Sequence, residues 1–151
     1  MTAGLVMYDV MQHVKPDVST VCLNASSMGS VLLSAGTRGK RFILPNGEVM
    51  IHQGYAGFQG TTPDFEIASK HMLKLFQRCN EILAEHTGQP LEKVKADSSR
   101  DFFMNAEQAV EYGIVDEVLQ PTKLLIGAGD SAPMLVGAGD FAGSRNGDHK
   151  P

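Results

Sequence analysis

A serine within a short run of small residues is the first candidate for chemistry in this chain. The run Ala25-Ser26-Ser27-Met28-Gly29 follows a β-rich segment and precedes helix-compatible apolar residues that extend to Ala35. A tight turn from strand to helix exposes a side chain where the first backbone N–H groups of the helix lack partners. Small residues suit such a turn because a bulky Cβ would collide with the backbone. The pattern resembles the elbow that displays nucleophiles in hydrolases, and an ordinary capping serine has the same signature.

Acyl transfer by a serine also needs an imidazole that takes the hydroxyl proton and a carboxylate that orients the imidazole. His52 follows the apolar run Val49-Met50-Ile51, which would deliver it to a sheet edge, although a lone histidine there is more often a core residue. The carboxylate stays open, because Asp97 and Asp101 share one polar loop and each could be a surface charge or a turn former. The remaining histidines fall on predicted helices or near the C-terminus, where solvated or capping roles are expected: His13, His71, His86 and His149.

The order of these candidates along the chain limits the possible scaffolds. Serine comes first, histidine second and aspartate third. The α/β-hydrolases have the order serine, acid, histidine, and chymotrypsin has the order histidine, aspartate, serine. Neither scaffold fits this chain.

Periodicity and turn signals predict the elements that position these residues. A helix is expected over residues 2–14, with Val6, Val10, Met11 and Val14 on one side and a stop at Lys15-Pro16. Residues 18–23 form a continuous strand-like run without a clean alternation of apolar and polar residues, which predicts a strand that is covered on both faces. Two short strands, 41–44 and 49–53, are expected on either side of a turn at Pro45-Asn46-Gly47-Glu48.

The longest predicted element is a helix over Pro63–His86, with Thr62 as its N-cap and Gly88 at its end. Its apolar residues recur at helical spacing and form a packing or assembly stripe: Phe65, Ala68, Met72, Leu75, Phe76, Cys79, Ile82 and Leu83. A helix of this length in a small domain is expected to project, and a projecting apolar stripe needs a partner. The preceding segment 54–60 is glycine-rich and reads as a flexible arm or an extended edge.

The rest of the chain divides at about residue 120. A short helix over 90–95, a capping box from Asn105 to Gln108 with Gly113 at the helix end, and a strand over 114–119 complete a domain of residues 1–120. Residues 121–151 form a Gly/Ala-rich tail in which Leu125–Asp130 is repeated as Leu135–Asp140. No phosphate-binding lysine and helix follow these repeats, so we expect a mobile extension.

Composition narrows the class of protein. The 151 residues are one domain's worth of chain, and a net charge of −4 without a basic block favours neither nucleic acid nor an anionic membrane surface as a partner. Cys22 and Cys79 stand apart in apolar surroundings, which predicts two buried thiols in a reducing compartment and no metal site. No secretory signal is visible, and the first residues read as a helix already under way, so we expect that a segment precedes them.

Three stretches together resemble the proteolytic subunit of the Clp protease (ClpP). They are Ala25–Gly29, Val49–Gln53, and Arg100–Met104 followed by Ala109–Gly113, within a resemblance that spans about residues 2–120. The resemblance implies an α/β fold of the ClpP/crotonase-like type, with repeated β-β-α units and a projecting handle helix. It assigns the role of nucleophile to Ser27, which directly precedes Met-Gly, the general base to His52 and the orienting carboxylate to Asp101. The backbone N–H of Met28 would be an oxyanion donor.

The same resemblance implies partners. Segment 54–60, with Tyr55, Ala56 and Gly57, would pair with extended substrate by strand addition. The long helix would dock two stacked heptameric rings, with Arg100 near the ring contact. The substrate would be unfolded polypeptide delivered by an AAA+ Clp ATPase, which alone uses ATP, so the subunit needs no cofactor, and neither nucleic acid nor membrane is a partner. The expected location is the cytoplasm, or an organellar matrix or stroma.

The chain also departs from this family's pattern. We expect that the family's N-terminal part is missing, including the Ser-Pro-Gly-Gly stretch that supplies a second oxyanion donor. Ser99 replaces an acidic residue, and Gly54 stands where proline follows His-Gln. Two alternatives therefore stay open: a non-catalytic structural subunit of a Clp-type ring, and a crotonase-type acyl-CoA enzyme, which would have a CoA pocket and no Ser-His-Asp set.

Overall fold

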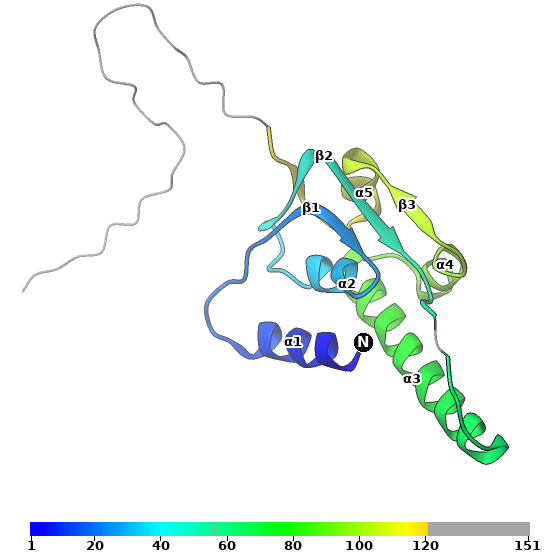
Figure 1. Ribbon diagram of the computed structural model, residues 1–151. Coiled ribbons are helices and arrows are strands. Elements are labelled where there is room, and N and C mark those ends of the chain that lie inside the picture. The colour runs from blue at the N-terminus through cyan, green and yellow to red at the C-terminus, as the bar shows by residue number, and fades with distance from the viewer. Residues whose placement is uncertain (56, 121–151) are drawn as a thin grey trace, which may run out of the picture. The chain divides into compact units, whose positions relative to one another are not determined.

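The computed structural model of the chain describes residues 1–55 and 57–120 and shows a mixed α/β fold (Figure 1). The elements in order are α1 (Thr2–His13), β1 (Thr20–Ser26), α2 (Met28–Ser34), β2 (Arg41–Ile51), α3 (Thr62–Thr87), α4 (Leu91–Asp97), β3 (Phe102–Met104), α5 (Ala106–Tyr112) and β4 (Glu117–Val118). The predicted α/β class is confirmed. The predicted tail, with its two repeats, lies outside the described residues.

Strand β2 is the centre of the sheet. β1 runs parallel to it on one side, from the pair Thr20–Arg41 to the pair Ser26–Met50. On the other side β3 runs antiparallel to the end of β2, and β4 runs parallel to its beginning. Because β1 and β2 are parallel and end in register, the residues that follow them leave the sheet at the same edge.

The region predicted as two strands and a turn is one strand with a bulge. The pairing with β1 steps from Cys22–Ile43 to Asn24–Glu48, so residues 44–47 of β2 stand opposite Leu23 alone. A Cβ at the buried Gly47 would lie 2.5 Å from the Ile43 side chain, so the bulge requires a residue without one. The prediction of two strands was wrong because the residues typical of a turn are absorbed into this bulge.

Within residues 1–55 and 57–120, helices cover one face of the sheet and leave the other exposed. Buried apolar side chains lie on the covered face: Cys22, Ile43, Val49, Ile51 and Met104. On the opposite face of β1, Val21 is 51% and Leu23 is 68% exposed. The expectation that strand 18–23 is covered on both faces is therefore wrong within the described part of the chain.

Helix α1 packs through a different face from the one its valines mark. Its buried residues are Gly4 and Tyr8, whereas Val6, Val10 and Val14 are exposed, contrary to the predicted stripe. A Cβ at Gly4 would lie 2.2 Å from Cγ of Met28, so glycine lets α1 approach α2 closely. Tyr8 Oη lies 3.2 Å from His86 Nε2, and this contact joins α1 to the end of α3.

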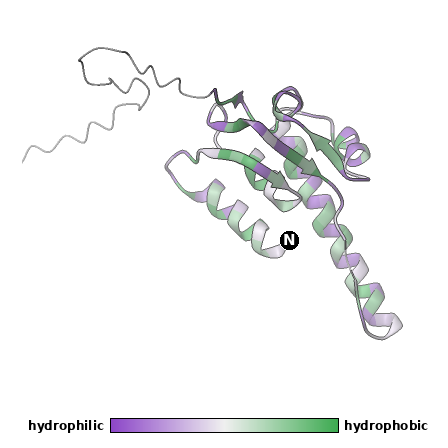
Figure 2. Ribbon diagram, turned by 45° about the horizontal axis from the view of Figure 1, so that its top comes forward, coloured by the Kyte–Doolittle hydropathy of each residue, from purple (hydrophilic) through white to green (hydrophobic). Residues whose placement is uncertain are grey.

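Helix α3 extends one residue beyond its predicted bounds at each end, so Thr62, predicted as the N-cap, is its first residue, whereas the predicted stop at Gly88 is confirmed. Its N-cap is Thr61, which forms a capping box with Asp64, and Gly88 ends it at φ 76°. The N-terminal half of α3 projects away from the sheet, with the segment that leads into it running alongside (Figure 1), and hydrophobic and hydrophilic residues alternate along it (Figure 2). The buried residues, Asn80, Ile82 and Leu83, belong to the C-terminal half. No helix in residues 1–55 and 57–120 has the length and apolar character needed to cross a membrane.

A buried ion pair holds the C-terminal elements against the sheet. Arg41 is 4% exposed, and its Nε donates to Asp116 Oδ2 at 3.0 Å. The hydrogen bonds that the Arg41 side chain donates to Asp116 hold the pKa of the Asp116 carboxyl below its ordinary value. The predicted capping box of α5 and its end at Gly113 are confirmed, whereas the strand predicted over 114–119 is confined to Glu117–Val118.

Candidate active site

The turn between β1 and α2 holds Ser27 in a strained conformation. Ser27 has φ 57° and ψ −120°, and it is the only residue other than glycine with positive φ in the described ranges. A serine adopts this region at a cost that the surroundings must offset. Here Ser27 N donates to Met50 O at 2.9 Å, and Ser30 Oγ donates to the same carbonyl at 2.7 Å. The turn is thus fastened to β2, as the elbow pattern requires.

The start of α2 presents backbone N–H groups beside Ser27. Met28 is the first residue of α2, so its N–H has no acceptor within the helix. The N–H groups of Ser30 and Val31 both donate to Ser27 O, at 3.1 and 3.4 Å. The residue named as an oxyanion donor therefore directly follows the serine at a helix N-terminus.

His52 and Asp101 are brought together by the register of two strands. β2 and β3 pair Ile51 with Phe102, and His52 and Asp101 are the next residues at that end of the ladder. His52 Nδ1 lies 3.0 Å from Asp101 Oδ1, with the histidine side chain 12% and the aspartate side chain 42% exposed. The antiparallel pairing thus places an imidazole and a carboxylate in hydrogen-bond contact.

The other candidate carboxylate, Asp97, is engaged elsewhere. Its Oδ2 accepts from Tyr112 Oη at 2.9 Å and pairs with Lys93 Nζ at 2.6 Å. Burial, followed by the hydrogen bond to Asp97, raises the pKa of Tyr112 above its ordinary value. The structure therefore selects Asp101 over Asp97 as the partner of His52.

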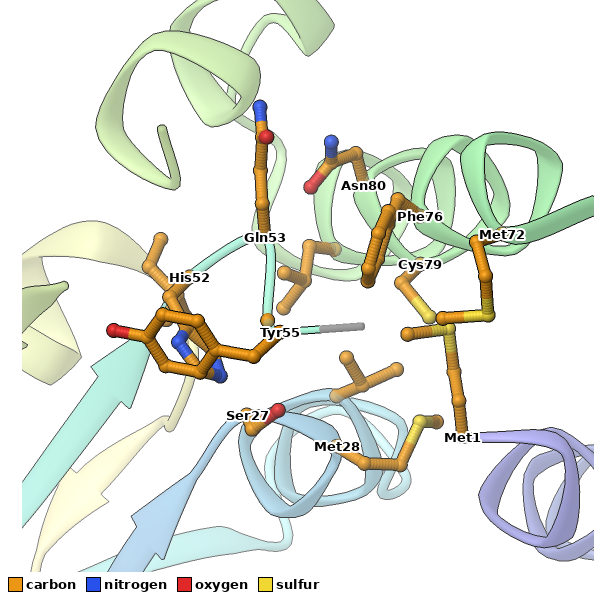
Figure 3. A pocket seen from close by; sticks show the side chains of 14 residues that line it. Met1, Ser27, Met28, His52, Gln53, Tyr55, Met72, Phe76, Cys79 and Asn80 are labelled. Atoms are coloured by element: carbon orange, nitrogen blue, oxygen red, sulfur yellow. The ribbon is translucent and has the colours of Figure 1, made fainter. Parts of the chain in front are cut away.

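Ser27 and His52 line one cavity of about 390 Å³. Figure 3 shows both side chains on one side of this cavity and the side chains of Met72, Phe76 and Cys79 on the other. No hydrogen bond joins Ser27 Oγ to the His52 ring in the part of the chain that the structure describes. His52 and Asp101 are thus in hydrogen-bond contact, whereas Ser27 Oγ and the His52 ring are not.

The segment predicted as an arm runs beside α3. Tyr55 is 87% exposed and packs edge-on against His52, with ring centroids 5.6 Å apart. Phe58 packs edge-on against Phe65 at the start of α3. Gly57 is exposed, and Ala56 lies outside the described residues.

Arg100 is exposed, and its Nη1 donates to Ser99 O at 2.8 Å. It lines a second cavity together with His52, Tyr55 and Asp101. The structure therefore places Arg100 at an exposed position beside the histidine–aspartate pair.

Two polar residues that the sequence analysis passed over support the pair. Ser98 Oγ donates to Asn80 Oδ1 at 3.2 Å, and Ser98 O accepts from Gln53 N at 2.8 Å. These contacts tie the loop before Asp101 to α3 and to the residue after His52. The sequence did contain a signal for this contact. Asn80 lies four positions after Phe76 and so falls on the apolar face of the helix, where a buried polar side chain needs a hydrogen-bond partner.

Neither cysteine belongs to a metal cluster in the described ranges, where no group of three His, Cys, Asp or Glu side chains is arranged to hold an ion. Cys22 is buried and Cys79 lines the cavity beside Ser27. Burial raises the pKa of both thiols, so they are mainly protonated at neutral pH.

The fold and this site define an α/β protein of the ClpP type, with a strained serine and a histidine–aspartate pair at the edge where two parallel strands end. Among protein-family models, the one described as Clp protease matches residues 1–122. The chain therefore belongs to the Clp protease family, and the resemblance seen in the sequence is confirmed. Members of this family are in general serine peptidases that form oligomeric rings with ATPases.

Proposed function

We propose that the chain is the proteolytic subunit of an ATP-dependent Clp protease, a serine endopeptidase that hydrolyses peptide bonds of unfolded polypeptides. Ser27 is the nucleophile, His52 the general base and Asp101 the carboxylate that orients His52. The observation that carries this proposal is the 3.0 Å contact between Asp101 Oδ1 and Nδ1 of His52, the histidine that lines the same cavity as Ser27.

Proton transfer follows from that contact. A carboxylate at Nδ1 holds the ring proton on that nitrogen, which leaves the lone pair of Nε2 to accept the proton of Ser27 Oγ. The serine oxygen attacks the peptide carbonyl, the Met28 N–H stabilises the resulting oxyanion, and Nε2 returns the proton to the leaving amine. Water then hydrolyses the acyl-enzyme by the same proton path. Hydrogen bonds of this kind are often long without substrate, and we propose that the contact between Ser27 and His52 closes on substrate binding or assembly.

The substrate is held through its backbone. In the described residues of the segment 54–60 no strand pairing is formed, and the segment begins two residues after His52. We propose that Tyr55, Ala56 and Gly57 add an extended substrate as a strand, which gives binding that tolerates many sequences.

Assembly and delivery complete the proposal. The projecting half of α3 exposes Phe65, Ile67 and Leu73, which supports docking of stacked heptameric rings through this helix, with Arg100 near the contact. An AAA+ Clp ATPase would unfold and deliver the substrate and use the ATP, so this subunit would need no cofactor. The proposed location is a reducing compartment, either the cytoplasm or an organellar matrix or stroma.

A non-catalytic ring subunit is the second candidate. This candidate is favoured because no hydrogen bond joins Ser27 Oγ to the His52 ring in the described part of the chain. The family membership speaks against the acyl-CoA enzyme considered from the sequence.

Hydrolysis of a short peptide separates the two candidates, because such a substrate needs no unfolding partner. The full chain is assayed with a capped tetrapeptide that releases an aminocoumarin, and compared with Ser27→Ala and with the neighbouring Ser26→Ala as a matched control. We expect cleavage by the wild type and by Ser26→Ala and none by Ser27→Ala. Cleavage by none of the three would support the structural subunit, and equal cleavage by all three would exclude Ser27 as the nucleophile.

A further inference from the structure

Sulfur atoms are concentrated on the wall of the cavity beside Ser27. Four of the fourteen residues that line this cavity carry sulfur: Met1, Met28, Met72 and Cys79. The whole chain has eight Met and two Cys among 151 residues, so the share on this wall is several times higher. Figure 3 shows the four side chains pointing into the cavity, with their sulfur atoms away from His52. We call these four residues the sulfur cluster.

Three helices bring the sulfur cluster together. Met1 is the N-cap of α1 and Met28 is the first residue of α2. A Cβ at Gly4 would lie 2.9 Å from Sδ of Met28, so the missing side chain leaves room for this thioether between α1 and α2. Met72 and Cys79 are seven positions apart, which places them on one face of α3, two turns or about 10 Å apart along its axis. Donors from three separate elements thus face one space, whose shape the flexible thioethers can adjust.

The chemistry of the sulfur cluster favours a soft monovalent cation. A thiolate and thioethers select Cu(I), whereas hard cations such as Mg²⁺ and Ca²⁺ prefer oxygen ligands. The single thiolate of Cys79 would neutralise one positive charge, and no Asp, Glu, Lys or Arg lies among the described residues of the cavity wall. A monovalent ion therefore leaves no net charge in this largely apolar cavity, whereas Zn²⁺ would leave one uncompensated. Burial raises the pKa of the Cys79 thiol, so the entering ion has to displace its proton.

We propose that the sulfur cluster binds one Cu(I) ion, with the thiolate of Cys79 and the thioethers of Met28 and Met72 as ligands and Met1 as a further donor. The step exchanges a thiol proton, which leaves to solvent, for a Cu–S bond, and no electron is transferred. The two cysteines are far apart in the sequence, so their spacing alone does not indicate this site. Because Ser27 lines the same cavity, the bound ion would obstruct it and inhibit peptide hydrolysis. This consequence, but not the binding of the ion, rests on the proposed function.

The test titrates the full chain with Cu(I), kept reduced by ascorbate in the absence of oxygen and buffered by the chelator bathocuproine disulfonate. Cys79→Ser and Met72→Leu each remove one ligand sulfur, and Leu takes up nearly the volume of Met. The matched controls are Cys22→Ala and Met11→Leu, whose sulfur atoms do not line the cavity. We expect the wild type and both controls to bind one equivalent, with sulfur ligands in the X-ray absorption spectrum. Affinity should fall by at least about tenfold in Met72→Leu and about 100-fold in Cys79→Ser, since even a partner that only orients a metal ligand is worth about 10- to 100-fold.

The outcomes separate this inference from the proposed function. An unchanged affinity in Cys79→Ser, an equal loss in Cys22→Ala, or a spectrum with nitrogen and oxygen ligands alone would overturn the site. Peptide hydrolysis by each protein is measured with Cu(I) and compared with its own copper-free rate. Inhibition of the wild type and of Cys22→Ala that is absent in Cys79→Ser supports the obstruction, whereas binding without inhibition overturns the obstruction and leaves the site in place.

An inactive wild type would remove the proposed function and leave the binding data to decide on the site. Thermal unfolding of each variant is recorded without copper. If Cys79→Ser does not fold, the affinity of Met72→Leu decides, and a value equal to that of the wild type would overturn the site.

Discussion

The backbone N–H of Ser27 donates to Met50 O at 2.9 Å, so the turn that carries the serine is fastened to the strand that ends just before His52. β1 and β2 are parallel, and Ser26 pairs with Met50 at their common end. Ligand sites in α/β proteins commonly lie at the carboxyl ends of parallel strands. The relative position of the two candidate catalytic groups is therefore a property of the sheet and not of flexible loops.

Replacing Asp101 should disable the proposed base without unfolding the protein. In Asp101→Asn the amide no longer holds a proton on Nδ1 of His52, so the ring adopts the tautomer that carries its proton on Nε2 and cannot accept one there. We expect kcat on an aminocoumarin peptide to fall by about 10⁴-fold, with little change in the urea unfolding midpoint.

Asp97→Asn is the matched control for that variant. Asp97 lies in the same polar region but bonds Tyr112 and Lys93. Its replacement should lower stability and leave kcat close to the wild-type value. A loss of activity in Asp97→Asn that equals the loss in Asp101→Asn would contradict the assignment of Asp101.

The ion pair between Arg41 and Asp116 should be essential for stability. Asp116→Asn leaves the guanidinium of Arg41 buried without its counter-charge, and breaking a buried pair in this way costs about 3–5 kcal/mol. Urea unfolding measures this loss. The control is Asp17→Asn, because the pair between Lys40 and Asp17 is exposed and its loss should cost at most about 1 kcal/mol. Similar losses in the two variants would refute the structural role given to Arg41.

His86 should make stability depend on pH. Burial lowers its pKa in the folded protein below the ordinary value of 6.5, so the unfolded chain binds more protons in the range between the two values. The free energy of unfolding should therefore decrease as the pH falls through about 6.5 towards the folded pKa, and no such loss should occur above that range. Replacement by glutamine keeps a partner for Tyr8 and removes the titrating group. Thermal unfolding between about pH 7.5 and 5.5 should thus be less pH-dependent in His86→Gln. An unchanged pH dependence would contradict this account.

The projecting half of α3 should carry the proposed ring contact. Ile67 and Leu73 are 69% and 65% exposed, so replacing both by glutamate leaves the core intact and charges the apolar surface. We expect the double variant Ile67→Glu/Leu73→Glu to form smaller particles than the wild type in light scattering, with an unchanged circular dichroism spectrum. A particle mass equal to that of the wild type would exclude this surface as the contact.

Local signals in the sequence predicted those elements whose ends are determined by their own residues. The capping box at Asn105, the glycines that end α3 and α5, and the turn at Ser27 all act over a few residues. The bulge at 44–47 and the uncovered face of β1 were missed because both depend on what packs beside the strand. The inner face of α1 was missed for a related reason: Gly4 and Tyr8 are buried by α2 and by His86, not by the hydropathy of the helix itself.

In the candidate site, too, the features determined by neighbouring residues could be predicted and those that depend on long-range packing could not. The elbow and the position of His52 after a strand were visible in the sequence. The choice between Asp97 and Asp101 was not, because it depends on the pairing of Ile51 with Phe102 across a separation of about fifty residues. The contact between Asn80 and Ser98 depends on the same long-range packing.

A fluorophosphonate tests the central claim most directly, because it forms an adduct only with a serine that is activated as a nucleophile. The full chain is treated with the reagent, digested and sequenced by mass spectrometry, alongside Ser26→Ala and His52→Ala. We predict one adduct, on Ser27, that persists in Ser26→Ala and is lost in His52→Ala. An adduct on Ser26, or none on the folded and assembled wild-type protein, would contradict the account.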